Sequence, residues 1–212
     1  MKRLKKLLVT ALLATATSTL VYANMPEQQL QQGLLAVERG DYRTTFELWK
    51  PLAEQGNAIA QSLLGTMYIE GHGIQQDYQQ AAKWFQKAAE QGDSVAQFSL
   101  GAMYHDGNGV KQNYQQAAKW FEKAAEQGDE RAQYNLAFMY QEGNGVQQDY
   151  QQAIKWYQKA AEQDMAAAQL NLGVMYGNGE GVKKNHKQAK IWFGKACKNG
   201  DQLACDYYQL SK

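Results

Sequence analysis

The chain has 212 residues, of which 44% are hydrophobic, 20% are charged and only two are prolines, a composition typical of one globular domain that permits long helices. Of its 22 basic and 21 acidic residues, four basic and no acidic ones lie in the first 23 positions, so residues 24–212 carry a net charge of −3. This mildly acidic balance provides no electrostatic footprint for nucleic acid or an anionic membrane surface, and it argues against both as partners.

The first 23 residues predict a cleaved secretory signal peptide. Basic residues between Lys2 and Lys6 precede a short apolar run, Leu7 to Leu20, and the small-x-small tripeptide Val21 to Ala23 predicts cleavage before Asn24. The apolar run is short for a bilayer-spanning helix, and no cysteine near the cleavage site suggests a lipid anchor. We therefore expect a periplasmic or secreted protein without stable membrane insertion.

Residues 24–212 predict a single repeat domain. Residues 24–57 are interpreted as a degenerate leading helix pair, and residues 58–212 as repeats with a period of 36 residues, ending in a C-terminal cap. In one unit, helices are expected from about Asp93 to Asp106 and from about Asn113 to Glu126. The first helix places small and large apolar residues on one face, at Ala96, Leu100, Met103 and Tyr104. The fold class is therefore an all-α solenoid of two-helix units.

The turns between units contain a glycine followed by a helix-capping residue. Gly128 suits the left-handed geometry at a helix end, and Asp129 suits the N-cap of the next helix. The fourth unit departs from this pattern, because Asp164 and Met165 occupy the equivalent positions. We expect that turn to be less stable by on the order of 1 kcal/mol.

Cys197 and Cys205 flank a short turn between two predicted antiparallel helices. The expected oxidising compartment favours a structural disulfide. A metal site and a redox pair are the alternatives, although two thiols without a neighbouring histidine make a weak zinc site.

The repeating pattern A-x-x-x-L-G-x-M-Y-x-x-G-x-G-V-x-x-D-Y-x-x-A-x-x-W-x-x-K-A-A-x-x-G resembles the Sel-one-like repeat, a relative of the tetratricopeptide repeat. The last unit, with its cysteine pair, also resembles the cysteine-rich subgroup of that family. The resemblance implies an α/α superhelix whose first helices line a concave face. It also implies a function as an adaptor or binding scaffold.

Some members of the cysteine-rich subgroup are described as β-lactamases, so a hydrolase acting on β-lactams or the cell wall is one alternative. No serine has a lysine three residues later, and no Lys-Thr-Gly occurs. The histidines at 72, 105 and 186 are isolated in sequence. We assign no catalytic residue, metal ligand or cofactor. A secreted effector that binds a host protein is a second alternative.

A binding face is predicted from the first helices, because one of their stripes varies while the second helices repeat almost unchanged. We name the following positions the variable stripe: Ile59, Leu63, Thr66, Glu70, Val95, Ser99, Ala102, Asp106, Arg131, Asn135, Phe138, Glu142, Ala167, Asn171, Val174 and Asn178. Asparagine amides can pair with an extended peptide backbone, and aromatic rings are frequent binding anchors.

The residues expected to bind a protein or peptide are therefore Ser99, Arg131, Tyr134, Asn135, Phe138 and Asn171. Sequence drift and packing between units are the alternative explanations for their variation. We expect the protein to act as a monomer.

Overall fold

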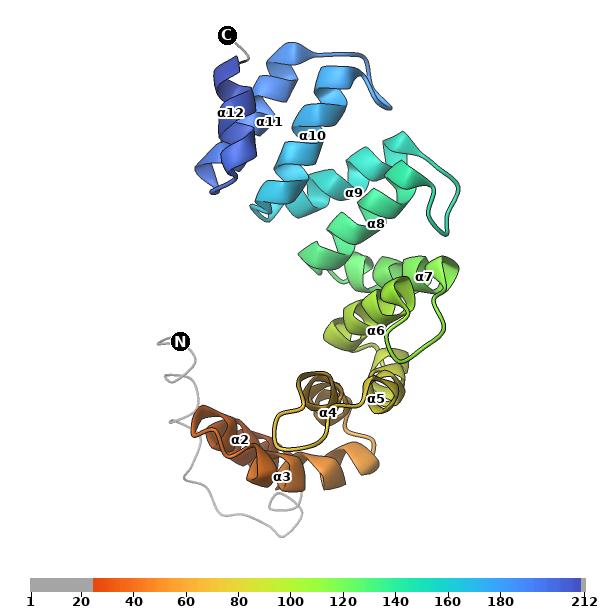
Figure 1. The fold of residues 1–212 in the computed structure, drawn as a ribbon, viewed down its shortest axis with the longest axis vertical. Coiled ribbons are helices and arrows are strands. Elements are labelled where there is room, and N and C mark those ends of the chain that lie inside the picture. The colour runs from red at the N-terminus through yellow and green to blue at the C-terminus, as the bar shows by residue number, and fades with distance from the viewer. Residues whose placement is uncertain (1–24, 211–212) are drawn as a thin grey trace, which may run out of the picture.

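The computed structural model describes residues 25–210, so the predicted signal peptide lies outside the described residues (Figure 1). Between residues 25 and 210 the chain is all helical, with 11 helices and no strand. They are α2 Met25–Glu38, α3 Tyr42–Glu54, α4 Ala58–Glu70, α5 Tyr78–Glu90, α6 Ser94–Asp106, α7 Tyr114–Glu126, α8 Glu130–Glu142, α9 Tyr150–Glu162, α10 Ala166–Asn178, α11 His186–Lys198 and α12 Gln202–Leu210.

Consecutive helices pack as pairs, and the pairs stack into an elongated, curved array (Figure 1). The predicted all-α solenoid of 36-residue units is confirmed. The predicted helix boundaries agree with α6 and α7 to within one residue, because the expected caps form. Asp93 accepts from the backbone N–H of Ala96 at 2.7 Å, and Asn113 accepts from that of Gln116 at 3.0 Å.

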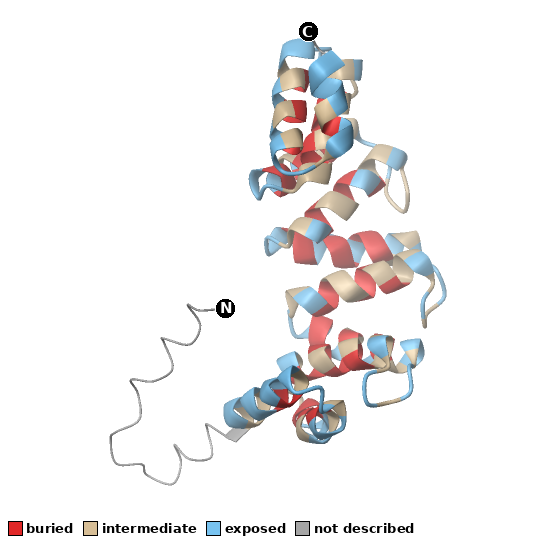
Figure 2. Ribbon diagram, turned by 60° about the vertical axis from the view of Figure 1, so that its left-hand side comes forward, coloured by how far each residue is buried: buried red, intermediate tan, exposed pale blue. Residues whose placement is uncertain are grey.

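The core consists of small residues packed against large rings. Buried positions run through the whole stack, as Figure 2 shows. The predicted packing face of α6 is buried at Ala96, Leu100 and Met103. Gly101 on the same helix lies so close to the ring of Phe121 on α7 that an added Cβ would be 2.7 Å from it. The absence of a Cβ at Gly101 therefore lets the Phe121 ring pack directly against α6.

A ladder of buried glutamines joins successive units, and the sequence analysis missed it. Gln133 Nε2 donates to the carbonyl of Ala125 at 3.1 Å, and its Oε1 accepts from Gln163 Nε2 at 2.9 Å. The same side chain thus bridges the end of α7 to the end of α9. Equivalent bridges are made by Gln61, Gln97 and Gln169. The polar groups are satisfied inside the core, which fixes the register between neighbouring units.

The turn between α9 and α10 has the predicted irregularity. Asp164 has a φ of +64°, in the left-handed region, and Met165 provides no side-chain cap for α10. The equivalent turn between α7 and α8 has Gly128 at φ +95°, and Asp129 caps α8 with two hydrogen bonds.

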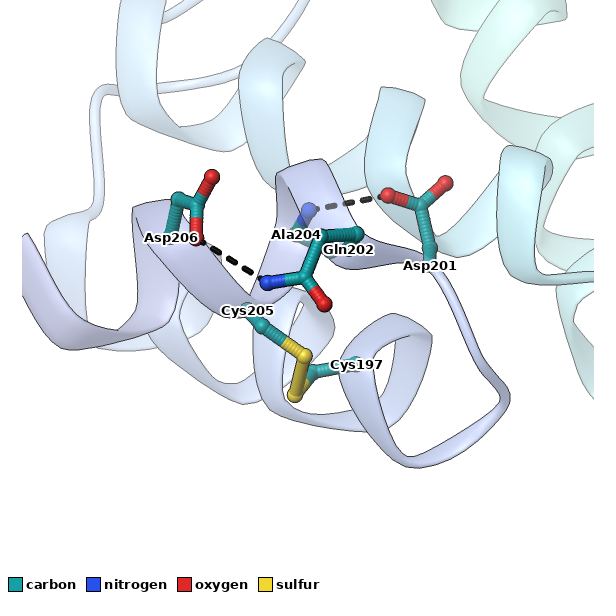
Figure 3. Close-up of a disulfide and its surroundings, with 6 residues drawn as sticks. All are labelled: Cys197, Asp201, Gln202, Ala204, Cys205 and Asp206. Atoms are coloured by element: carbon teal, nitrogen blue, oxygen red, sulfur yellow. Dashed lines mark hydrogen bonds between the residues drawn. A yellow bond between two sulfur atoms is a disulfide. The ribbon is translucent and has the colours of Figure 1, made fainter.

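The last two helices are joined covalently. Cys197 on α11 and Cys205 on α12 form a disulfide with a Cα–Cα distance of 4.5 Å (Figure 3). In the intervening turn, Asp201 accepts from the N–H of Ala204 at 2.8 Å and so caps α12.

Candidate protein-binding face

The six candidate residues lie on three successive first helices. Ser99 is on α6, Asn171 is on α10, and the remaining four are on α8. Phe138 and Arg131 are exposed, whereas Ser99, Tyr134, Asn135 and Asn171 are half-buried. The solenoid therefore brings these residues onto neighbouring helices, but their surroundings differ.

Two candidates contact Tyr157, a fully buried residue of α9. The rings of Tyr134 and Tyr157 are 5.5 Å apart between centroids. The Tyr157 hydroxyl donates to Gln141 Oε1 at 3.0 Å. Burial raises the pKa of Tyr157 well above its usual value, and a hydrogen bond from Asn171 offsets part of that rise. Tyr134 and Asn171 thus belong to a cluster around the buried Tyr157 hydroxyl, and their side chains contribute to packing between α8, α9 and α10.

Sequence reasoning missed Tyr157, although a signal was present. Three of the other units have phenylalanine at this position, namely Phe85, Phe121 and Phe193. A hydroxyl introduced into a repeated buried position requires a polar partner, and the neighbouring helices provide it here.

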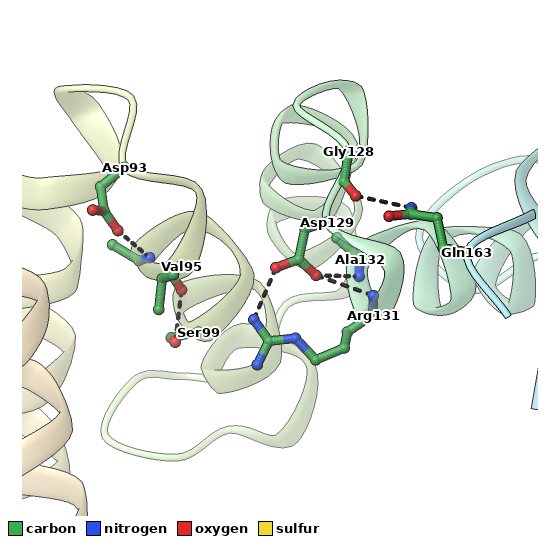
Figure 4. A network of polar contacts seen from close by, with 9 residues as sticks. Asp93, Val95, Ser99, Gly128, Asp129, Arg131, Ala132 and Gln163 are labelled. Atoms are coloured by element: carbon green, nitrogen blue, oxygen red, sulfur yellow. Dashed lines mark hydrogen bonds and ion pairs between the residues drawn. The ribbon is translucent and has the colours of Figure 1, made fainter. Parts of the chain in front are cut away.

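Arg131 and Ser99 are engaged within the chain. Arg131 pairs with Asp129 at 2.8 Å, and its guanidinium lies 4.2 Å from the ring centroid of Phe98 on α6. Ser99 donates its hydroxyl to the carbonyl of Val95 at 2.8 Å (Figure 4). Both side chains contribute to local structure, and Arg131 also connects two neighbouring units.

Asn135 and Phe138 are the candidates best placed to contact another molecule. Phe138 is 39% exposed although it is a large apolar residue. Asn135 makes no side-chain hydrogen bond with any other residue in the described range 25–210, so its amide can donate and accept. They are four and seven residues beyond Arg131 on the same stripe of α8.

Hollows at both ends of the solenoid are lined by residues of the variable stripe. Near the N-terminal end, Leu30 and Leu34 of α2 and Ile59 and Leu63 of α4 line an apolar cavity of about 600 Å³. Near the C-terminal end, a cavity of about 690 Å³ is lined by stripe residues Val174 and Asn178 of α10, and also by Phe193, Tyr207 and Leu210. Both ends of the variable stripe therefore border a partly apolar hollow.

The potential metal-ligating side chains of residues 25–210 lie singly or in pairs. No group of three or more histidine, cysteine and acidic side chains is arranged around a possible metal position there. His72 stacks on Tyr42 at 4.5 Å, and His105 contacts Asp106 at 2.7 Å, so both have local partners. No helix in the described range is long and apolar enough to cross a bilayer.

Comparison with known proteins identifies the repeat. The Sel1 repeat model matches residues 30–57, 58–93, 94–129, 130–165 and 166–201. A protective antigen of uropathogenic Escherichia coli strains with an SLR fold is similar at 37% identity and a TM-score of 0.84, over 90% of this chain and 42% of that one. This chain thus spans less than half the length of that antigen. No curated protein matches.

Two further solved structures support the assignment. A Sel1 repeat protein from Oxalobacter formigenes is 34% identical with a TM-score of 0.81, over 84% of this chain and 74% of that one. A Sel1 repeat protein from Klebsiella pneumoniae, at 22% identity and a TM-score of 0.55 over 92% and 96% of the two chains, shares the fold. With the family model covering residues 30–201 in five consecutive units, the chain belongs to the Sel1 repeat family.

Proposed function

We propose that the protein is an exported interaction module that binds a protein or peptide along the variable stripe of its first helices. Sel1 repeats are in general protein–protein interaction modules. The observation that carries the proposal is the pair of hollows lined by stripe residues, one between α2 and α4 and one beside α10.

The chemistry of the stripe suits an extended peptide. Phe138 offers an exposed ring for an apolar side chain, and the Asn135 amide offers one donor group and one acceptor group to a peptide backbone. The apolar hollow at Ile59 and Leu63 would take a second anchor. An extended peptide of the partner that runs along the stack would contact the anchor sites of several successive units at once.

Site-specific photo-crosslinking tests the location. A benzophenone amino acid is placed at Phe138 and, as a matched control, at the exposed Lys119 of α7. We expect discrete adducts from position 138 in envelope extracts, and none of these at position 119. Mass spectrometry of the adducts identifies the partner.

The second step uses a double substitution, Asn135→Ala with Phe138→Ala, which leaves the Tyr157 cluster intact. It should weaken binding of the identified partner at least tenfold, while the far-ultraviolet helical spectrum is unchanged. Identical adducts at positions 119 and 138, or full affinity in the double variant, would refute the stripe as the binding face.

Export is tested by the N-terminus of the product. If the first 23 residues are a signal peptide, the protein recovered from the periplasm or medium begins at Asn24. A full-length chain retained in the cytoplasmic fraction would contradict export, and it would leave the binding proposal to be judged by the crosslinking result.

A further inference from the structure

The charges of the chain are distributed unevenly along the solenoid. Residues 24–165 contain 18 acidic and 11 basic residues, so the first four helix pairs are acidic. Residues 166–201 contain six lysines and only two acidic residues. The mildly acidic total of residues 24–212, from which we expected no anionic membrane surface as a partner, therefore includes one strongly basic unit.

The outer face of α11 accounts for most of this difference. Position 187 is lysine where the equivalent second helices have Gln79, Gln115 and Gln151. Position 198 is lysine where they have Glu90, Glu126 and Glu162. Position 190 is lysine where they have Ala82, Ala118 and Ile154. Since the other second helices are nearly identical, this accumulation of positive charge is specific to the last unit.

Four lysines of α11 lie along one groove. Lys187, Lys190, Lys195 and Lys198 line one shallow groove of about 580 Å³, which extends over α11 and part of α12. The first and last of these lysines are eleven positions apart on the helix, a rise of about 16 Å. Lys183 and Lys184, in the loop before α11, add two further charges to the same unit.

Most of these ammonium groups are available to an external anion. Within the described range, Lys183, Lys184, Lys187 and Lys198 make no ion pair. The two acidic residues of the unit have other hydrogen bonds, since Glu180 accepts from Asn178 at 2.9 Å and Asp201 caps α12.

Apolar side chains are exposed between the lysines. Ile191 is 46% exposed and Tyr208 is 43% exposed, and both line the same groove. The side chain of Lys190 lies over the Tyr208 ring at 5.3 Å. An anionic partner that also accepts apolar groups would therefore satisfy both components of this surface.

We propose that the outer face of α11 binds the surface of an anionic bilayer peripherally. Lysines are flexible, strongly hydrated point charges, which suit a diffuse negative surface better than the fixed geometry of one carboxylate or phosphate. Ile191 and Tyr208 would enter the interfacial region, where aliphatic and aromatic side chains are favourable. The lysine row belongs to a second helix, so the protein would be held at the membrane by elements separate from the first-helix stripe.

Vesicle cosedimentation of the processed chain tests the proposal. Vesicles of phosphatidylcholine alone are compared with vesicles that contain one-third phosphatidylglycerol. We expect binding to the anionic vesicles only. Binding should also weaken strongly between 0.1 M and 1 M salt, because the Debye length falls from about 10 Å to about 3 Å.

The decisive variant is Lys184→Gln with Lys187→Gln and Lys198→Gln, in which two substitutions restore the residues of the other units. The partition coefficient should fall about 100-fold, since each lysine near an anionic surface contributes roughly fivefold. The matched control, Lys83→Gln with Lys119→Gln and Lys155→Gln, removes equal charge from α5, α7 and α9. It should change the partition coefficient by less than about threefold if only the α11 row contacts the bilayer.

A third variant distinguishes a bilayer from a soluble acidic polymer. Ile191→Gln removes an exposed apolar side chain of the groove without adding a charge, and it should weaken vesicle binding because an apolar contact is lost. Undiminished binding of this variant to vesicles, equal losses in the two triple variants, or tighter binding of the parent chain to soluble polyglutamate than to anionic vesicles would overturn the proposal. These assays contain no protein partner, so their failure would leave the proposed function of the stripe untouched.

Discussion

The turn between α9 and α10 offers a direct test of how the repeat is stabilised. Asp164 has a φ of +64°, whereas the equivalent Gly92, Gly128 and Gly200 have φ values from +94° to +96°. A residue with a Cβ loses about 1 kcal/mol or more in this region, and aspartate somewhat less because it tolerates the conformation better than most residues. Asp164→Gly should therefore stabilise the turn.

The expected gain follows from what the aspartate side chain contributes. Its Oδ1 accepts from Asn199 Nδ2 at a long 3.3 Å in an exposed position, a bond that adds little. The backbone carbonyl of residue 164, which also accepts from Asn199, remains in the variant. We expect a net gain of about 0.5–1 kcal/mol.

Hydrogen exchange is the suitable assay, because solenoids unfold in local steps rather than as one two-state unit. Protection of the amides at the start of α10 should rise about two- to fivefold in Asp164→Gly, as expected from this range of free energies. The reciprocal control, Gly128→Asp, should lower protection at the start of α8. Unchanged protection in both variants would refute the view that left-handed geometry limits the stability of these turns.

Three further predictions concern single contacts. Gln133→Ala should lower the free energy of local opening at α8 by about 2 kcal/mol, because it removes two bridging hydrogen bonds and leaves a void; an exposed control, Gln151→Ala, should change it by less than about 0.5 kcal/mol, both measured by hydrogen exchange. Reduction of the Cys197–Cys205 disulfide should destabilise the α11–α12 pair by about 2.5 kcal/mol, measured as faster hydrogen exchange of α12 amides with no change at α4. The buried Tyr157 hydroxyl has a raised pKa, so the native state holds its proton more tightly than the unfolded state. Its contribution is present below about pH 10 and is lost as pH rises through the folded pKa. Stability should therefore fall more steeply at alkaline pH in the parent than in Tyr157→Phe, and equal slopes in pH-dependent denaturation would contradict this assignment.

The fold could be predicted from the sequence, because capping and turn residues at the helix boundaries recur in each repeat. Asp93 and Asn113 cap helices through bonds to residues three positions later, so their role depends only on near neighbours. The irregular turn at Asp164 was predicted for the same reason. Local rules fix the units, and the 36-residue period then fixes their stacking.

The glutamine ladder was not predicted, because its partners are distant in sequence. A glutamine in a helix usually faces solvent, and the residues next to Gln133 in the sequence do not indicate that Gln163, thirty residues later, lies beside it. The internal signal was the invariance of Gln61, Gln97, Gln133 and Gln169 in first helices whose variable stripe lies close by in sequence. Uniformity across units marks a structural requirement even when the residue type is polar.

The variable stripe was a weaker guide, since variation alone does not separate binding positions from local contacts. Arg131 and Ser99 vary and yet make polar contacts within the chain, whereas over residues 25–210 Asn135 makes no side-chain hydrogen bond and Phe138 is an exposed ring. Only side-chain geometry divides the two groups. The structure thereby reduces a six-residue hypothesis to two positions whose substitution tests binding rather than folding.

Internal comparison also separates the two proposed surfaces. The second helices α5, α7 and α9 have nearly the same sequence, so the additional lysines of α11 can be recognised by comparison with three equivalent helices of the same chain. First helices have no uniform outer stripe, so variation there carries less information about any single residue. If both proposals hold, the α11 lysine variant should lose vesicle binding and keep its partner, while Asn135→Ala with Phe138→Ala should do the reverse. Loss of both activities in either variant would show that the surfaces are coupled, and the solenoid would then act as one continuous interface rather than as a tethered binding module.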